Sequence, residues 1–175
     1  IRNIFRSQQN IKIILDELIR INPLSNQITT KNNTYFYDFL VLATGSEPSY
    51  FEYDQWKNFS TSLKNIEDAI LLRGKILKAF EKAERINNIK SIEKLMRFVL
   101  IGGGPTGVEM AGAIAELSKK VLTKEFTTIN TKEAEIILLE AEPSILPTAS
   151  NYLSIYATKT LESLGVVVKC NTVVQ

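Results

Sequence analysis

A six-residue segment near the middle of the chain has the residue types and spacing to bind phosphate. Gly102–Gly107 (GGGPTG) satisfies G-x-G-x-x-G between an apolar run and a helical pattern. Gly102 permits a tight turn, Gly104 lets the backbone approach a pyrophosphate, and Gly107 lets a helix pack closely on a strand. Pro105 suits the first helical position, where its missing N–H needs no partner, and the remaining free N–H groups and the helix dipole attract phosphate. The segment predicts a dinucleotide-binding turn; a glycine-rich turn without a ligand is the alternative.

Glu140 ends the next apolar run, where an acid can accept hydrogen bonds from the ribose hydroxyls of adenosine. A carboxylate there would repel a 2′-phosphate, and residues 141–148 contain no Lys or Arg to attract one. These features favour NADH over NADPH. Glu140 lies 33 residues after Gly107, whereas about 20 is usual for this motif, so we expect an insertion around residues 121–133. The alternative is an acid that only ends a strand.

Two further segments give weaker signals. Glu109 lies early in the helix on an otherwise apolar stretch. The helix dipole alone would stabilise it there, or it could contact a nicotinamide and help to transfer a proton, so it is the candidate catalytic residue. Residues 40–45 (LVLATG) form an apolar run ending in small residues. By itself this run indicates only a strand with a tight exit.

The composition limits the chemistry of the chain. Its 175 residues include no His and one Cys, so a His-based triad, a His metal site and an internal disulfide are excluded, and we expect no metal. A single Cys fits a reducing compartment. The 21 Lys and Arg nearly balance the 19 Asp and Glu, which gives no case for nucleic-acid binding. No apolar run reaches the roughly 18 residues of a membrane span.

The first part of the chain is predicted to contain strands. The β-prone runs 11–15 and 27–30 are separated by a polar turn and predict a small antiparallel segment. Residues 39–43 are apolar throughout, as in a strand buried on both faces. Asn65 is then expected to cap a helix.

From residue 97 onward the pattern alternates between strands and helices. Strands are expected at 98–101, 136–139 and 166–168, with one helix from Pro105 to about Lys120. A second helix is expected after Ser150, which would cap it. Its apolar face would be formed by Leu153, Tyr156, Leu161 and Leu164, and Gly165 would end it. This alternation predicts an α/β fold with a doubly wound parallel sheet.

Two of these segments together resemble a known group of flavoproteins. Residues 37–45 (YDFLVLATG) followed by 98–104 (FVLIGGG) resemble the flavoproteins with two dinucleotide-binding domains, where the ATG segment belongs to the FAD domain and the second glycine motif binds NAD(P)H. A finer resemblance is to the type II NADH:quinone oxidoreductases. It is carried by residues 49–51 (SYF), 63–69 (LKNIEDA), 72–73 (LR), 80–84 (FEKAE), 102–117 (GGGPTGVEMAGAIAEL), 140–143 (EAEP) and 145–147 (ILP).

The resemblance implies an FAD/NAD(P)-binding Rossmann-like fold with a small antiparallel β segment, in an incomplete two-domain flavoprotein. Residues 1–64 would be the C-terminal part of the first FAD-domain segment, 65–96 a connecting helix, and 97–175 the N-terminal half of the NADH-binding domain. The FAD glycine motif that precedes these segments in the family has no counterpart here, nor do the later flavin-contacting and membrane-binding segments. The chain therefore resembles the middle third of an enzyme, and we expect it to hold little or no flavin alone.

The resemblance also implies a function: hydride transfer from NADH to FAD, then transfer of two electrons to a quinone without proton pumping. The cofactors would be FAD and NADH. Members are usually peripheral membrane proteins and often homodimers. We therefore expect a cytoplasmic protein, or one bound to the cytoplasmic face of the membrane through segments missing from this chain. The residues implied are Ala43, Thr44 and Gly45 for FAD; Gly102, Gly103, Gly104, Pro105, Thr106, Gly107 and Glu140 for NADH; and Glu109 near the nicotinamide and the quinone.

Three other interpretations stay open. A disulfide, ferredoxin or peroxide reductase of the same superfamily would share these motifs. A non-catalytic module that senses the ratio of NADH to NAD would need only residues 97–175. A fragment without activity of its own is the third.

Overall fold

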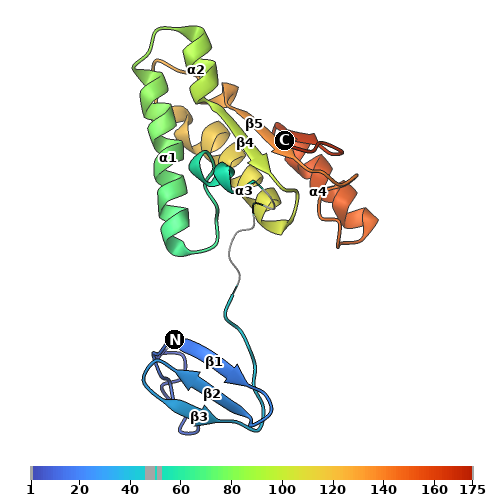
Figure 1. Ribbon diagram of the computed structural model, residues 1–175. Coiled ribbons are helices and arrows are strands. Elements are labelled where there is room, and N and C mark those ends of the chain that lie inside the picture. The colour runs from blue at the N-terminus through green and yellow to red at the C-terminus, as the bar shows by residue number, and fades with distance from the viewer. Residues whose placement is uncertain (1, 46–49, 51–52, 175) are drawn as a thin grey trace. The chain divides into compact units, whose positions relative to one another are not determined.

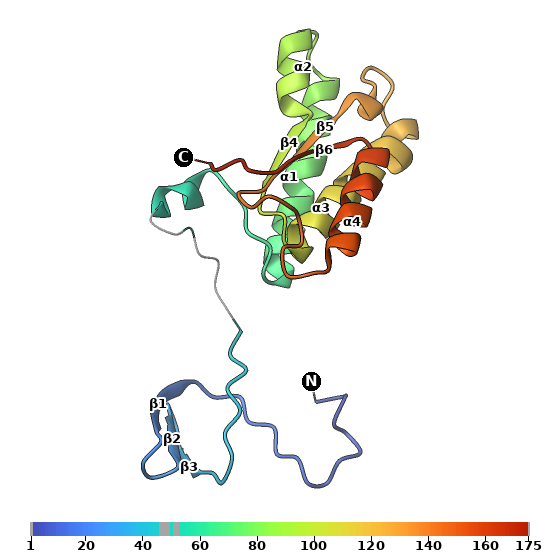
Figure 2. The ribbon, with the colours of Figure 1, turned by 90° about the vertical axis from the view of Figure 1, so that its right-hand side faces the viewer.

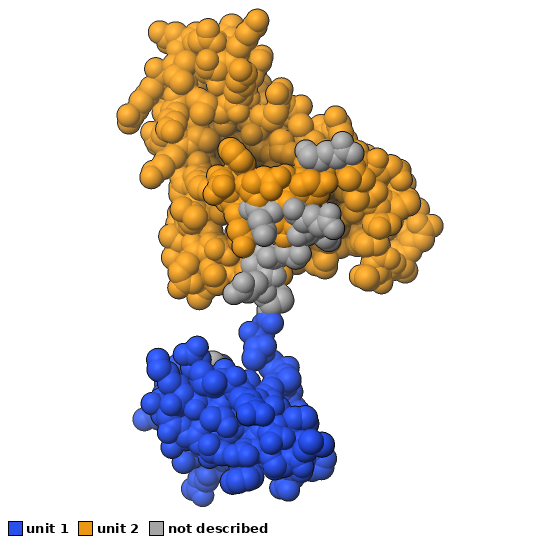
Figure 3. Space-filling view, viewed as in Figure 1, with its two compact units in different colours: residues 1–46 blue, residues 47–175 orange. Residues whose placement is uncertain are grey.

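The computed structural model describes residues 2–45, 50 and 53–174 (Figure 1). The chain divides into two compact units, Ile1–Ser46 and Glu47–Gln175 (Figure 3). The first contains a small antiparallel sheet, and the second contains helices packed on a parallel sheet. The expected α/β fold with a small antiparallel segment is therefore confirmed.

The first unit is built on a three-stranded sheet in the order β1-β2-β3. Its strands are β1 (Leu18–Asn22), β2 (Gln27–Thr30) and β3 (Thr34–Phe36). The strand expected at 27–30 is confirmed, but the strand expected at 11–15 is wrong, because β1 begins at Leu18, seven residues after the expected start. A hairpin pairs the residues nearest its turn, and the pairing starts at Asn22 with Gln27.

Asp16 fixes the other end of this hairpin. Its carboxylate accepts hydrogen bonds from the Thr30 hydroxyl at 2.8 Å and from the Asn32 side-chain amide at 2.9 Å. The bond from Thr30, with those from the Glu17 N–H and from Asn32, holds the pKa of Asp16 below its usual value although partial burial raises it. Asp16 therefore joins the start of β1 to the β2–β3 turn.

The strand expected at 39–43 is also wrong for this chain. Residues 40–45 have no regular secondary structure, and Phe39, Val41 and Leu42 are 93%, 85% and 59% exposed. A strand buried on both faces needs a hydrogen-bonded neighbour and a layer on each side. The described residues of the first unit supply neither, because its sheet ends at β3. An apolar run indicates that its side chains favour burial, but it does not provide the neighbouring strand with which it would pair.

The second unit is centred on a parallel sheet in the order β4-β5-β6. Its strands are β4 (Arg97–Ile101), β5 (Glu135–Leu139) and β6 (Val166–Lys169), which confirms the three predicted strands. Helices α3 (Pro105–Glu116) and α4 (Asn151–Ser163) provide the crossovers, and both lie on one face of the sheet (Figure 2). The observed order strand–helix–strand–helix–strand is the predicted one.

Side chains alternate between the two faces of this sheet, as the strand period requires. Ile136 and Leu138 are fully buried beneath the helices, with Val166 beside them. On the opposite face, Val99 and Ile101 are 51% and 58% exposed. The core of the second unit therefore lies on one face of the sheet, beneath α3 and α4 and the buried residues Ile76, Phe80 and Ala83 of the helical region before β4.

The helical region before β4 contains two helices, α1 (Ile66–Glu84) and α2 (Ile89–Leu95). Asn65 caps α1 as expected, since its side chain accepts from the Asp68 N–H at 2.7 Å. Asn88 caps α2 in the same way, accepting from the Ser91 N–H at 3.0 Å, and so separates it from α1. Phe80 of α1 is fully buried and packs against two other aromatic rings, those of Phe98 and Phe126.

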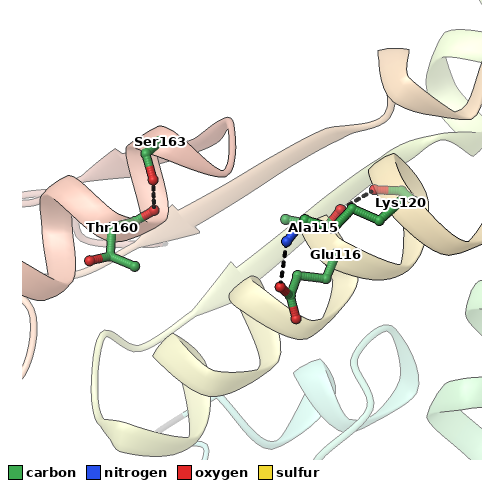
Figure 4. Close-up of polar contacts among 6 residues, drawn as sticks. Ala115, Glu116, Lys120, Thr160 and Ser163 are labelled. Carbon is green, nitrogen blue, oxygen red and sulfur yellow. Dashed lines mark hydrogen bonds and ion pairs between the residues drawn. The ribbon is translucent and has the colours of Figure 1, made fainter.

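The expected ends of α4 are confirmed, but its buried face differs. The Ser150 side chain accepts from the Leu153 N–H at 3.4 Å, and Gly165 has the positive φ of 78° typical of a helix end. The Ser163 hydroxyl donates to the Thr160 carbonyl at 2.7 Å in the last turn (Figure 4).

Only part of the apolar face expected for α4 is buried. Leu161 is buried together with Ser154, whereas Leu153 and Tyr156 are 50% and 61% exposed. Ser154, a polar residue that was not among the four predicted positions, is therefore part of the buried face of α4.

Beyond α3 the chain continues through a π-helical turn, Leu117–Val121, and a 3-10 turn, Leu122–Lys124. Lys120 forms an ion pair with Glu116 at 2.8 Å along this stretch (Figure 4). The helical path to about Lys120 is therefore confirmed. Among the described residues, no helix has both the length and the apolar character needed to cross a membrane.

Candidate nucleotide-binding site

The glycine segment joins the end of β4 to the start of α3. Gly102 has a φ of 103°, which a residue with a side chain adopts only with strain, and its N–H donates to the Leu139 carbonyl at 2.8 Å. Gly104 is the N-cap residue of α3, and Pro105 occupies the first turn. The strand–turn–helix arrangement needed for dinucleotide binding is present.

The surroundings that a side chain would meet differ from one glycine of this turn to the next. A Cβ on Gly107 would lie 1.9 Å from the Gly102 carbonyl oxygen, so the helix packs on the turn only because Gly107 has none. A Cβ on Gly103 would lie 2.8 Å from Ile145 and 2.9 Å from the Glu140 carboxylate. At Gly104 the same atom would meet nothing within 4 Å, and its backbone conformation (φ −70°, ψ 178°) is open to any residue. Gly104 is therefore not explained by the packing of the chain, and it borders open space.

The start of α3 faces the same open space with hydrogen-bond donors. The first N–H groups of a helix have no partner within the helix, and they carry the positive end of its dipole. Pro105 and Thr106 are exposed in this first turn. An anionic group in front of Gly104 would therefore meet N–H donors with no side chain in the way.

Glu140 lies directly beside the glycine turn. Its carboxylate accepts one hydrogen bond from the Gly103 N–H and a second from the Glu142 N–H at 2.9 Å. A carboxylate can accept about four hydrogen bonds, so capacity remains for ribose hydroxyls. The structure thus brings Glu140 and Gly102–Gly107 together at the carboxyl ends of β4 and β5, where open α/β sheets bind ligands.

The other predicted site residues lie elsewhere. Glu109 is exposed on α3, on the side away from its buried residues Ala111, Ile114 and Ala115. Ala43, Thr44 and Gly45 are exposed at the end of the first unit, and Gly45 has a φ of 78°. Both positions are therefore accessible, and Glu109 lies on the same helix as Gly107.

The long spacing between Gly107 and Glu140 is accommodated at the opposite end of the sheet. The segment after α3 returns to β5 past Glu84 at the end of α1, whose carboxylate accepts from the N–H groups of Thr127, Thr128 and Ile129 at 3.0–3.1 Å. Partial burial raises the pKa of Glu84, but the hydrogen bonds from these N–H groups have the larger combined effect and lower the pKa to about 2. Glu84 therefore anchors the insertion that the sequence analysis placed around residues 121–133.

The loop after Glu140 is a further part of the site that was not expected from the sequence. Leu146 adopts a positive φ of 50°, and its N–H donates to the Gly103 carbonyl at 2.7 Å. Ile145 is fully buried against Gly103, and its carbonyl accepts from the Ser154 hydroxyl at 2.7 Å. No local pattern signals a positive φ at a leucine. One signal was available for Ser154: it lies seven residues, or two helical turns, before Leu161 of α4, and therefore on the same buried face of the helix.

Comparison with known proteins identifies the family. Residues 2–175 match the family model described as pyridine nucleotide-disulphide oxidoreductase. The chain belongs to this family. It is 39% identical to the type II NADH:quinone oxidoreductase NdhA of Mycobacterium tuberculosis, over 99% of this chain and 38% of that protein. It is 30% identical to external NADH-ubiquinone oxidoreductase 2, mitochondrial, of Saccharomyces cerevisiae, over 97% of this chain and 33% of that protein.

A solved structure has a similar fold. The structure of NDH2 from Plasmodium falciparum in complex with NADH superposes with a TM-score of 0.74 and 26% identity, over 89% of this chain and 33% of that one. The chain thus spans about a third to two-fifths of the length of these relatives. The similarity to type II NADH:quinone oxidoreductases expected from the sequence is confirmed.

Proposed function

We propose that this chain is the central part of an FAD-dependent NADH:quinone oxidoreductase that does not pump protons. The relatives that carry this activity in their names match almost the whole chain, at 39% and 30% identity. The domain assignment that follows is the one expected from the sequence: an FAD-domain segment in residues 1–64, a connecting segment in 65–96, and half of the NADH-binding domain in 97–175.

The observation that carries the proposal is the open space at Gly104. Close packing explains Gly103 and Gly107, and a positive φ of 103° explains Gly102, but neither reason applies at Gly104. A pyrophosphate lying against the backbone at the start of α3 would require a glycine there. A dinucleotide would therefore account for Gly104, the one glycine of the four that the chain itself leaves unexplained.

Each residue of this site has a distinct role toward NADH. The N–H groups of the first turn of α3 would bind the pyrophosphate, and Pro105 and Thr106 would lie beside it. Glu140 would accept the adenosine ribose hydroxyls with its remaining acceptor capacity, and its charge would disfavour a 2′-phosphate. Glu109 would lie near the nicotinamide and the quinone, where an exposed carboxylate can accept or supply a proton.

The exposed segment Ala43–Gly45 would contact FAD, since small side chains and a positive φ at Gly45 let the backbone approach a bulky group. FAD, when bound, supplies the hydride acceptor and the path for electrons to the quinone. The chain contributes the segments that orient the two cofactors.

We also propose contact with the membrane surface, where a quinone dissolves, and a location in the cytoplasm or on the cytoplasmic face of the membrane. Residues 71–97 contain eight of the 21 Lys and Arg but only three of the 19 Asp and Glu. Lys78 and Lys82 of α1, with Arg85 just after the helix, line an open surface hollow together with Glu81. This charge asymmetry supports attraction to anionic lipid headgroups. Pairing of two copies remains a proposal from the resemblance alone.

The test uses the full-length gene product with detergent or membrane supplied. NADH is added under anaerobic conditions while flavin absorbance is followed, and then a quinone and, in a separate sample, a disulfide are added. The proposal predicts loss of flavin absorbance with NADH and rapid recovery with the quinone only. Recovery with the disulfide only would mean that the electron acceptor is a disulfide and not a quinone. A preparation without flavin would favour a nucleotide-sensing module.

A further inference from the structure

A chain of contacts connects α4 to the glycine turn through the loop after β5. It begins at Ser154, which is 4% exposed and whose hydroxyl donates to the Ile145 carbonyl at 2.7 Å. Ile145 is fully buried, and its side chain lies only 2.8 Å from the position that a Cβ of Gly103 would take. A buried polar bond of this kind is costly to leave unmade, so it holds the loop in one position.

The same loop occupies both backbone groups of Gly103. The Gly103 N–H donates to Glu140, and the Gly103 carbonyl accepts from the Leu146 N–H at 2.7 Å. Leu146 does so with a φ of 50°, a conformation that costs energy for a residue with a side chain. The surrounding contacts, including the bond from Ser154, must therefore maintain that conformation.

We infer that Ser154 is a positioning residue for nucleotide recognition. By fixing Ile145 and Leu146, it holds Gly103, and through Gly103 it sets where the Glu140 carboxylate stands relative to the phosphate-binding turn. The substrate class it serves is the dinucleotide without a 2′-phosphate. This inference rests on the proposed function, because it assigns Ser154 to the selectivity of that same site.

The consequence concerns selectivity more than stability. Glu140 can accept ribose hydroxyls and repel a 2′-phosphate only if its carboxylate stays at one distance from the turn. If the loop loosens, NADH loses a hydrogen-bond acceptor and NADPH loses a repulsive charge. A residue with a purely structural role would change the melting temperature and leave the ratio of the two affinities unchanged.

The chain supplies a matched control in Ser118, another buried serine with a bonded hydroxyl. Ser118 is fully buried, and its hydroxyl donates to the Ala115 carbonyl of its own helical path at 3.2 Å. It contacts neither the loop nor Gly103 through that bond. Ser154→Ala and Ser118→Ala therefore each delete one buried hydroxyl, but only the first deletion reaches the glycine turn.

The experiment titrates NADH and NADPH against the chain and both variants, following nucleotide fluorescence, with thermal melting of each protein. We expect Ser154→Ala to raise the Kd for NADH about tenfold and to reduce the NADH:NADPH preference about tenfold. Ser118→Ala should change either quantity less than about twofold. Exchange of the Gly103 amide with solvent should accelerate in Ser154→Ala alone, since its bond to Glu140 would open more often.

Equal changes in the two variants, or an unaltered NADH:NADPH ratio in Ser154→Ala, would overturn the inference while leaving the proposed function in place. A full-length gene product that melts cooperatively but binds no NADH in the same titration would overturn both. Should Ser154→Ala not fold, Ser154→Cys carries the same comparison, because it keeps a side chain of similar size with a weaker donor.

Discussion

The two turns assigned to cofactors, Ala43–Gly45 and Gly102–Gly107, follow apolar runs of similar composition but are held very differently. Residues 98–101 form a strand paired to β5, and the turn after it is fixed by Leu139, Glu140 and the helix that follows. Residues 40–45 have no regular structure and are mostly exposed. A strand–turn–helix unit that carries its own covering helix organises its turn locally, whereas the ATG segment has no neighbouring strand or helix in the described part of the first unit to organise it.

Amide hydrogen exchange should show the largest difference between these regions. Backbone N–H groups in 98–101 and 136–139 are bonded within a packed sheet, whereas those of 40–45 lie in an exposed irregular segment. Exchange should therefore be roughly a thousandfold slower in the two strands, given ordinary domain stability. Comparable protection in both regions would mean that the ATG segment is held as firmly as the glycine turn.

Substitution of Gly107 should break the local organisation of the second turn. Gly107→Ala places a Cβ 1.9 Å from the Gly102 carbonyl oxygen, and neither backbone segment can move without separating α3 from β4. We expect a loss of about 2–3 kcal/mol in the free energy of unfolding, measured by urea denaturation.

Gly112→Ala is the control for Gly107→Ala. A Cβ there would make only an ordinary contact with Leu161 at 3.7 Å, and alanine has the higher helix propensity. Its unfolding should match that of the unsubstituted chain or shift slightly toward greater stability. If both variants unfolded alike, the close approach at Gly107 would not be a real constraint.

The contribution of Glu84 should appear as a difference in pH dependence. Its folded-state pKa of about 2 lies below the ordinary value of 4.5, because three backbone N–H groups bind the carboxylate although partial burial opposes them. Its stabilisation is therefore complete above about pH 4.5 and is lost as the pH falls through about 2. Glu84→Gln should lower the urea midpoint at pH 7 and reduce its further decline between about pH 5 and 2.5.

Glu81→Gln provides the control for Glu84→Gln, since Glu81 is exposed on the same helix. Its midpoint should follow that of the unsubstituted chain at each pH. If the urea midpoint of Glu84→Gln changed with pH as that of the unsubstituted chain does, the hydrogen bonds from Thr127–Ile129 to the Glu84 carboxylate would not be formed in solution.

Much of the second unit could be predicted because its signals are local. Three apolar runs gave the strands, and Asn65, Ser150 and Gly165 marked helix ends through bonds or dihedral angles that involve only nearby residues. The glycine motif predicted its own turn, since the strand before it and the helix after it are adjacent in sequence.

The remaining features depend on contacts between distant residues, which sequence patterns do not specify. The apolar run at 39–43 has no partner in its unit, so hydrophobicity alone gave a wrong strand. The positive φ of Leu146 and the bond from Ser154 arise only once α4 packs against β6 and the loop after β5 folds between them. The anchoring of residues 127–129 by Glu84 likewise spans more than forty positions.

The central claim is that the open space at Gly104 receives the pyrophosphate of NADH, and the most direct test substitutes that glycine. Gly104→Ala adds a methyl group that meets nothing within 4 Å, so the free energy of unfolding should change by no more than about 1 kcal/mol. NADH titrations of the chain and the variant should show affinity weakened at least about tenfold by the methyl group in the path of the phosphates. Equal NADH affinity with unchanged stability would contradict the account, because the space at Gly104 would then have no ligand.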